Sequence, residues 1–222
     1  MISAGHPADF ILTATVRAIN GVYNASTAPP RTRREDPRFA RVVEAIRRIE
    51  QAGALGMRIE TRDGQTLTFI AFRRGLDEDA ERDIRLVKDA LGIDPTIDEL
   101  RLVYGLVRRR PDEIALLTRS MQELMGELSA GIDVPERDLL DGRATQRTGS
   151  VAGTSDAGLV HIRSSDEQPL DAYAAVHYRN HWFWVDDRDL GSKRVFMFLM
   201  MFSSPVEIGT VPQAPILTIP AR

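Results

Sequence analysis

Apolar residues recur at helical spacing in four segments of the first 130 residues, and each stripe predicts a helix with one buried face. In segment 39–50 the apolar positions alternate with a charged face, and two glycines follow it. Segment 77–91 begins with three acidic residues, which favour the N-terminus of a helix. The other two predicted helices span 9–23 and 111–130, the second with Pro111 at its first position.

Two stretches in the first half alternate between apolar and polar residues, as half-buried strands do. They span 57–62 and 66–73, and Asp63-Gly64 lies between them. Asp-Gly is a strong hairpin signal because both turn residues must accept positive φ. The pattern predicts a hairpin over 57–73 and a third strand over 99–107.

The second half predicts shorter elements. Strand-like runs span 159–163, 172–178 and 182–186, and an almost wholly apolar helix follows at 192–203. A helix that is apolar all round belongs in a core or in a subunit interface. A last strand is expected at 216–219, between prolines that suit a sheet edge.

These elements predict an α+β fold of small antiparallel sheets with flanking helices, in two sub-domains. The N-terminal part spans 1–140 and contains the hairpin 57–73. Residues 141–158 are rich in Gly, Ser and Thr and predict a flexible linker or loop. The C-terminal part spans 159–222, is rich in strands and contains the apolar helix 192–203.

The cysteine content and the net charge of the chain exclude some classes of function and disfavour others. The chain has 222 residues and no cysteine, which excludes disulfides, thiol catalysis and zinc–thiolate sites. A net charge of −3 gives no global basic field, and acidic residues interrupt the arginines of segment 31–48, so nucleic acid is the least favoured partner.

The chain shows no sign of secretion or membrane insertion. The most apolar run, 195–202, is too short to span a bilayer, so we expect no membrane span. Residues 1–10 have no positive cluster ahead of an apolar run, so we expect no secretory signal and a cytoplasmic protein.

Familiar catalytic motifs are missing. The sequence contains no GxxxxGK[ST], GxGxxG, GxSxG, EF-hand loop or HExxH. We therefore expect no cofactor and no catalytic residues, and a non-enzymatic role is favoured. His177 and His181 lie four residues apart across a predicted hairpin turn rather than on one helix face, so no metal site is expected.

Segment 177–196 holds the densest group of charged and aromatic residues. Its candidate ligand-binding residues are Asp186, Asp187, Asp189, Lys193 and Arg194. Carboxylates at a strand end could bind a hard cation, and cations at the start of a helix could hold a phosphate or carboxylate. The favoured reading is structural: Asp189 or Ser192 caps the helix, and Asp187 pairs with Arg188 or Lys193.

Aromatic side chains in the same segment are candidates for a protein interface or for core packing. In alternating strands they usually form cross-strand pairs rather than a stacking platform for a ligand. The candidate interface residues are Trp182, Trp184, Phe196 and Phe198.

Two blocks of the sequence, 113–135 and 178–202, resemble a family of uncharacterised bacterial hypothetical proteins. The second block carries the distinctive string DDRDLGSKR after an aromatic run. The resemblance implies a bacterial, non-secreted protein and brings no activity, cofactor or catalytic residue.

The leading functional hypothesis is a structural or protein-interaction subunit of a bacterial assembly, which self-associates or binds another protein through its C-terminal part. The alternative is an enzyme or small-ligand binder that uses the corner 186–194 for a phosphorylated or metal-bound ligand.

Overall fold

A computed structural model describes residues 8–26, 33–75, 77–144 and 159–203. These residues form an α+β fold, as predicted, with helices, one six-stranded sheet and one three-stranded sheet. The helices are α1 (Ala8–Thr15), α2 (Pro37–Gln51), α3 (Glu78–Ala90), α4 (Met121–Ser129), α5 (Glu136–Leu140) and α6 (Leu190–Ser203). The strands are β1 (Val16–Ile19), β2 (Val22–Tyr23), β3 (Leu55–Arg62), β4 (Gln65–Phe72), β5 (Glu99–Tyr104), β6 (Glu113–Thr118), β7 (Arg163–Ser165), β8 (Ala172–Tyr178) and β9 (His181–Asp186).

The larger sheet has the strand order β2-β1-β6-β5-β4-β3. Its neighbours pair antiparallel except β5 and β6, which run parallel, so the sheet is mixed and larger than the two or three antiparallel strands expected from the sequence. The predicted hairpin is confirmed as β3–β4. Asp63 (φ 53°) and Gly64 (φ 74°) form its turn, and both occupy the left-handed region that a type I′ turn requires.

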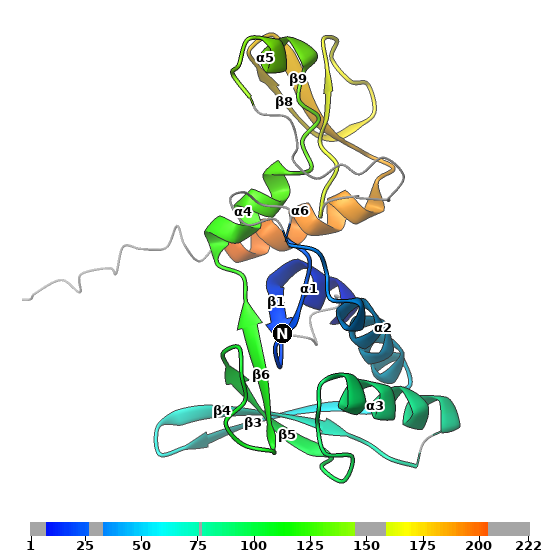
Figure 1. Cartoon of the computed structure of the whole chain (residues 1–222). Coiled ribbons are helices and arrows are strands. Elements are labelled where there is room, and N and C mark those ends of the chain that lie inside the picture. Colours follow the sequence, from blue (N-terminus) through cyan, green and yellow to red (C-terminus); the bar gives the residue numbers. More distant parts are fainter. Residues whose placement is uncertain (1–7, 27–32, 76, 145–158, 204–222) are drawn as a thin grey trace, which may run out of the picture.

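The predicted helices at 39–50 and 77–91 are confirmed as α2 and α3. Each begins at a carboxylate cap: the side chain of Asp36 accepts a hydrogen bond from the Arg38 N–H, and that of Asp77 accepts one from the Ala80 N–H. The two helices lie side by side against the six-stranded sheet (Figure 1). Phe39, Val42, Ile49, Val87 and Leu100 are among the fully buried side chains of this core.

The helix predicted over 9–23 is wrong in its second half. The helix α1 ends at Thr15, and the chain turns back at Asn20 (φ 46°) and Gly21 (φ 79°) to form β1 and β2. The strand β1 lies between β2 and β6, and Val16, Ala18 and Ile19 are buried in it. A short strand that is buried on both faces has no period-2 pattern, so its apolar residues also fit a helical stripe.

The helix predicted over 111–130 is also wrong in its first half. Segment Glu113–Thr118 is the strand β6, which lies between β1 and β5. The helix begins only after Ser120, whose hydroxyl accepts from the Glu123 N–H while the Glu123 carboxylate accepts from the Ser120 N–H. This capping box fixes the start of α4.

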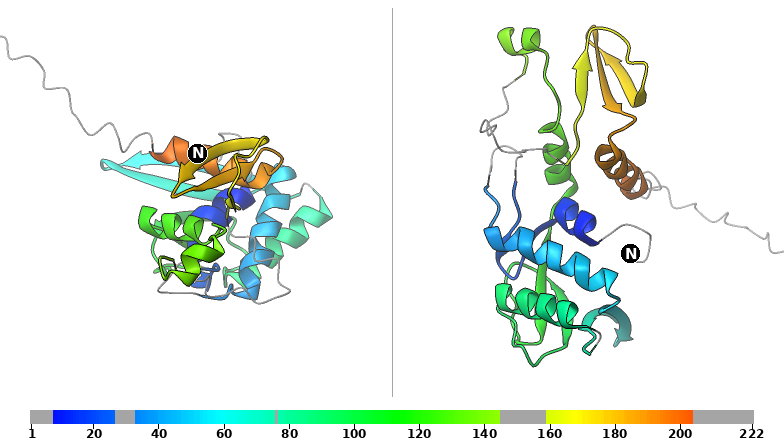
Figure 2. Two further views of the ribbon diagram at one scale, coloured as in Figure 1. Left: turned by 90° about the horizontal axis from the view of Figure 1, so that it is seen from above. Right: turned by 90° about the vertical axis from the view of Figure 1, so that its right-hand side faces the viewer.

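The smaller sheet has the order β7-β9-β8, and all its pairs are antiparallel. The strand expected over 159–163 begins only at Arg163, and the strand expected over 216–219 lies outside the described residues. Figures 1 and 2 show α4 and α6 between the two sheets. The predicted apolar helix 192–203 is α6, which begins two residues earlier.

The helix α6 has two faces. Val195 and Phe198 are buried, and the Phe198 ring packs edge-on against Phe10 of α1 with 5.8 Å between ring centroids. Leu190, Met197 and Met200 are exposed. Within the described residues, no helix is both long and apolar enough to cross a membrane. The division into sub-domains at 141–158 stays a prediction.

Candidate functional site

The acidic and basic residues of segment 186–194 do come together, at the corner where β9 leads into α6. The Lys193 ammonium donates to a carboxylate oxygen of Asp187 (2.7 Å) and to its backbone carbonyl (3.0 Å). The Asp186 carboxylate accepts from the Arg188 N–H (2.9 Å) and forms an ion pair with Arg163 of β7 (3.2 Å). Most of these charged groups are therefore already paired with residues of the corner or of the adjacent strand β7.

Asp189 is the capping residue of α6. One carboxylate oxygen accepts from the Ser192 N–H (3.0 Å), and the other accepts from the Ser192 hydroxyl (2.6 Å). Burial raises the pKa of Asp189, but these hydrogen bonds outweigh it and hold the pKa below its ordinary value. The Ser192 hydroxyl in turn accepts from the His161 N–H (2.8 Å), so the cap also anchors the segment before β7.

Arg194 differs from the other four candidate residues. It lies on the exposed side of α6 and makes no ion pair with any residue that the structure describes. Its neighbours on this side are the exposed Leu190, Met197 and Met200. The five candidate residues thus do not converge on one hollow: four belong to the corner, and Arg194 belongs to the outer face of the helix.

The four candidate interface residues are only partly available to a partner. Trp182, Trp184 and Phe196 are half-buried, whereas Phe198 is buried against α1. The Trp182 ring lies 5.1 Å from that of His177, and the Arg163 guanidinium lies over the Trp184 ring at 5.2 Å. These aromatic contacts are cross-strand pairs within the small sheet.

Two of the described histidines, His161 and His181, pair with acidic residues rather than with another histidine. The His181 Nδ1 atom lies 2.7 Å from Asp166, and the His161 Nε2 atom lies 2.9 Å from Asp133. Among the described residues there is no group of three or more His, Cys, Asp and Glu side chains that could hold a metal ion.

A polar cleft that sequence analysis did not identify lies between α5 and the small sheet. It has a volume of about 660 Å³ and is lined by Arg137, Arg143, Asp166, Arg179 and His181, among others. Arg143 pairs with Asp141 (3.4 Å), and the Arg179 guanidinium lies over the Tyr178 ring at 5.2 Å. The lining side chains come from three separate segments, so no single motif could reveal the cleft.

A second polar group that the sequence did not indicate is buried where β1 and β2 meet α4. The Arg119 side chain donates to the backbone carbonyls of Thr13, Ala14 and Ala25 and lies 3.8 Å from Glu127. Burial lowers the pKa of the Arg119 guanidinium from its ordinary value. Because its hydrogen bonds go to backbone carbonyls of the α1 and β2 region, Arg119 joins the elements of the fold.

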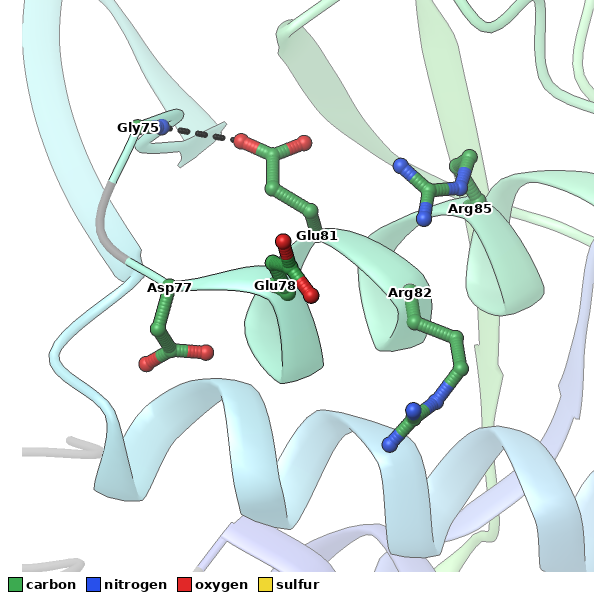
Figure 3. A pocket seen from close by; sticks show the side chains of 6 residues that line it. All are labelled: Gly75, Asp77, Glu78, Glu81, Arg82 and Arg85. Carbon is green, nitrogen blue, oxygen red and sulfur yellow. Dashed lines mark hydrogen bonds between the residues drawn. The ribbon is translucent and has the colours of Figure 1, made fainter.

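An open pocket of about 580 Å³ lies at the start of α3 (Figure 3). Backbone N–H groups at a helix N-terminus bind anions, and the protein's own carboxylates occupy two of the N–H groups around this pocket. Asp77 caps the helix, and Glu81 accepts from the Gly75 N–H (2.8 Å). An anion would have to compete with Asp77 and Glu81 for these two N–H groups.

Comparison with known proteins adds no homologue to this picture. The chain matches no protein-family model, no curated protein and no solved structure.

Proposed function

We propose that this chain is a non-enzymatic protein-interaction subunit and that it binds a partner protein through the outer face of α6. The observation that carries the proposal is the exposure of methionine. All five methionines whose side chains the structure describes are at least 38% exposed: Met57, Met121, Met125, Met197 and Met200. Methionine is normally a buried residue, and exposed methionines are typical of adaptable binding surfaces.

The outer face of α6 has the composition of an interface. Leu190, Arg194 and Met197 follow each other at helical spacing, and Met200 lies one turn further on. Leu190 is 66% exposed and Met200 is 67% exposed, so this apolar surface is open to a partner. Arginine and methionine are enriched at protein interfaces. Because Arg194 has no ion pair among the described residues, the expected partner offers an apolar surface with a carboxylate.

The alternative, a ligand bound at the corner 186–194, has less support. A cation would compete with Lys193 and Ser192 for the carboxylates of Asp187 and Asp189. An anion would compete with Asp187 for Lys193. The proposal includes the cytoplasmic location expected from the sequence.

Methionine oxidation tests the proposal. Brief treatment with hydrogen peroxide, followed by mass spectrometry, measures how fast each methionine becomes its sulfoxide. We expect Met197 and Met200 to oxidise severalfold more slowly in cells that produce the protein naturally than in the purified, dilute chain. Met125 on α4 is the internal reference, because it is similarly exposed but lies outside the proposed surface. Equal rates for Met197 and Met200 in both settings would contradict the proposal.

A further inference from the structure

The two edges of the six-stranded sheet differ in a way that points to self-association. One edge is β2, which has two residues, and short edge strands offer little to a second chain. The other edge is β3, which has eight residues and pairs with β4 along its whole length without a register shift. It contains no proline and no bulge, two of the devices that block pairing with another strand.

The hairpin geometry determines which backbone groups of β3 are free. Arg62 and Gln65 flank the two-residue turn, so they exchange hydrogen bonds with each other. Counting back from Arg62, every second residue bonds to β4. The residues between them, Met57, Ile59 and Thr61, direct their N–H and C=O groups away from the sheet. All three are exposed: Met57 by 42% and Ile59 by 61%.

The charged residues of β3 are complementary to those of a second, antiparallel copy of the same strand. Arg58, Glu60 and Arg62 share the opposite face of the strand from Ile59, since side chains alternate. If two copies of β3 pair antiparallel about a two-fold axis at Ile59, Arg58 of each copy lies opposite Glu60 of the other. Within one chain Arg58 forms ion pairs with Glu60 and with Glu99 of β5, so both groups are already held at this face.

Other registers are less favourable. A shift of two residues in either direction places Arg58 opposite Arg58 or Glu60 opposite Glu60, and like charges directly opposite each other destabilise a strand pair. A shift of four residues towards the turn pairs Glu60 with Arg62 but leaves only the last half of the strand paired. The register about Ile59 pairs residues 56–62, all of β3 except Leu55, and places both charged residues opposite a residue of the other sign.

We propose that β3 pairs antiparallel with β3 of a second copy of this chain, in the register that places Ile59 opposite Ile59. The two six-stranded sheets then form one continuous sheet across the dimer. Met57 of each copy faces Thr61 of the other, and each pair exchanges two backbone hydrogen bonds. This surface is separate from the outer face of α6, so the inference does not depend on the proposed function.

Charge reversal tests both the dimer and its register. Light scattering of the full chain, coupled to size exclusion over a range of concentrations, is expected to show a concentration-dependent dimer. Arg58→Glu and Glu60→Arg each place like charges opposite each other twice, and we expect each to raise the dimer dissociation constant about tenfold or more. A wild-type chain that stays monomeric at about millimolar concentration would overturn the proposal.

Mixing the two variants gives the decisive result. A pair made of one Arg58→Glu chain and one Glu60→Arg chain has opposite charges at both positions, so the mixture is expected to form a heterodimer that neither variant forms alone. Formation of this heterodimer in the mixture also shows that both variants are folded. Dimers that persist in both single variants, or monomers in the mixture, would exclude this register.

A backbone variant provides an independent measurement. Ile59→Pro removes an N–H group that faces away from β4, and proline is tolerated at such an edge position. We expect this variant to be monomeric and to keep the wild-type circular dichroism spectrum. An Ile59→Pro chain that is folded and still dimeric would place the dimer contact elsewhere.

Discussion

The guanidinium group of Arg48 on α2 donates two parallel hydrogen bonds, of 2.7 Å and 2.8 Å, to the carboxylate of Asp83 on α3. The Asp83 side chain is only 5% exposed, whereas Arg48 is 43% exposed. Two-pronged arginine–carboxylate pairs are stronger and geometrically stricter than single ones. This pair fixes how the two helices lie against each other over the core.

Loss of the Asp83 charge should therefore weaken the fold. Asp83→Asn keeps the shape of the side chain but removes the charged acceptor, and we expect the free energy of unfolding to fall by about 1–3 kcal/mol. Urea denaturation measures this change. Asp79→Asn is the matched control on the same helix, because Asp79 and its partner Arg82 are both largely exposed; that substitution should cost less than about 0.5 kcal/mol.

The same pair predicts a pH dependence. The hydrogen bonds from Arg48 hold the pKa of Asp83 below its ordinary value, although burial acts in the opposite direction. A lowered folded-state pKa means that the stabilisation is complete above the unfolded-state pKa of about 3.9 and is lost as pH falls through the lower folded-state value. The difference in melting temperature between the wild type and Asp83→Asn should shrink from pH 5 to pH 2. A constant difference over this range would show that the charge plays no part.

Lys88 and Asp98 should respond unequally to substitution. The Lys88 side chain is 2% exposed, and its ammonium donates to Asp98 (2.7 Å) and to the Pro95 carbonyl (3.0 Å). Asp98 is 40% exposed and also pairs with Arg74 (2.8 Å). Asp98→Asn leaves a buried ammonium without its counter-charge and should cost about 3 kcal/mol. Lys88→Met leaves Asp98 with Arg74 and with water.

We expect Lys88→Met to cost about 1 kcal/mol or less, because methionine fills a similar volume and the remaining carboxylate keeps a partner. Urea denaturation of both variants gives the comparison. If Lys88→Met lowered the free energy of unfolding more than Asp98→Asn, the unequal burial of the two residues would not determine the cost. The pair would then contribute through its mutual attraction alone.

The corner between β9 and α6 allows a test of its structural role. Ser192→Ala removes the acceptor of the His161 N–H and the hydroxyl donor to Asp189, and Ser192 is buried. We expect a loss of about 1–3 kcal/mol in urea denaturation. Arg194→Gln, at an exposed position of the same helix without an ion pair among the described residues, should leave stability within about 0.5 kcal/mol. Equal effects of the two substitutions would contradict the role given to the cap.

Local signals made part of this fold predictable. Asp63-Gly64 fixed the β3–β4 hairpin, and the acidic start of α3 fixed that helix, because turn geometry and helix caps depend on neighbouring residues. The strand β6 was not predictable in this way. Its side chains are buried or half-buried on both faces from Glu113 to Leu117, so Ile114 and Leu117 fit a helical stripe as well as a strand.

The same distinction applies to the candidate sites. The pairing of Lys193 with Asp187 was one of two partners expected from the sequence, because the two residues lie six positions apart at one corner. The buried position of Arg119 was not expected, since its partners Thr13 and Ala25 lie about 100 residues away. Contacts of this kind depend on the assembled sheet, and the spacing of residues carries no sign of them.

Gly131 gives a last prediction, on the connection between the two halves of the chain. A Cβ atom at this position would lie 1.8 Å from the backbone oxygen of Val160, so only glycine allows this approach. The approach is held by hydrogen bonds from the Ile162 N–H to Gly131 and from the Asp133 N–H to Ile162, both 2.8 Å long. Gly131→Ala should therefore push the segment before β7 away from the end of α4.

We expect faster amide hydrogen exchange at Ile162 and Asp133 in Gly131→Ala, together with a loss of stability of about 2 kcal/mol or more, because the obstacle is backbone and cannot rotate away. Gly56→Ala is the matched control, since its new Cβ atom would meet the Ala71 oxygen at an ordinary 3.7 Å. Exchange that accelerates only around Ile162 and Asp133, while β3–β6 keep wild-type protection, would mean that the C-terminal half can loosen without the six-stranded sheet. Acceleration throughout the chain would mean that the two halves unfold as one cooperative unit.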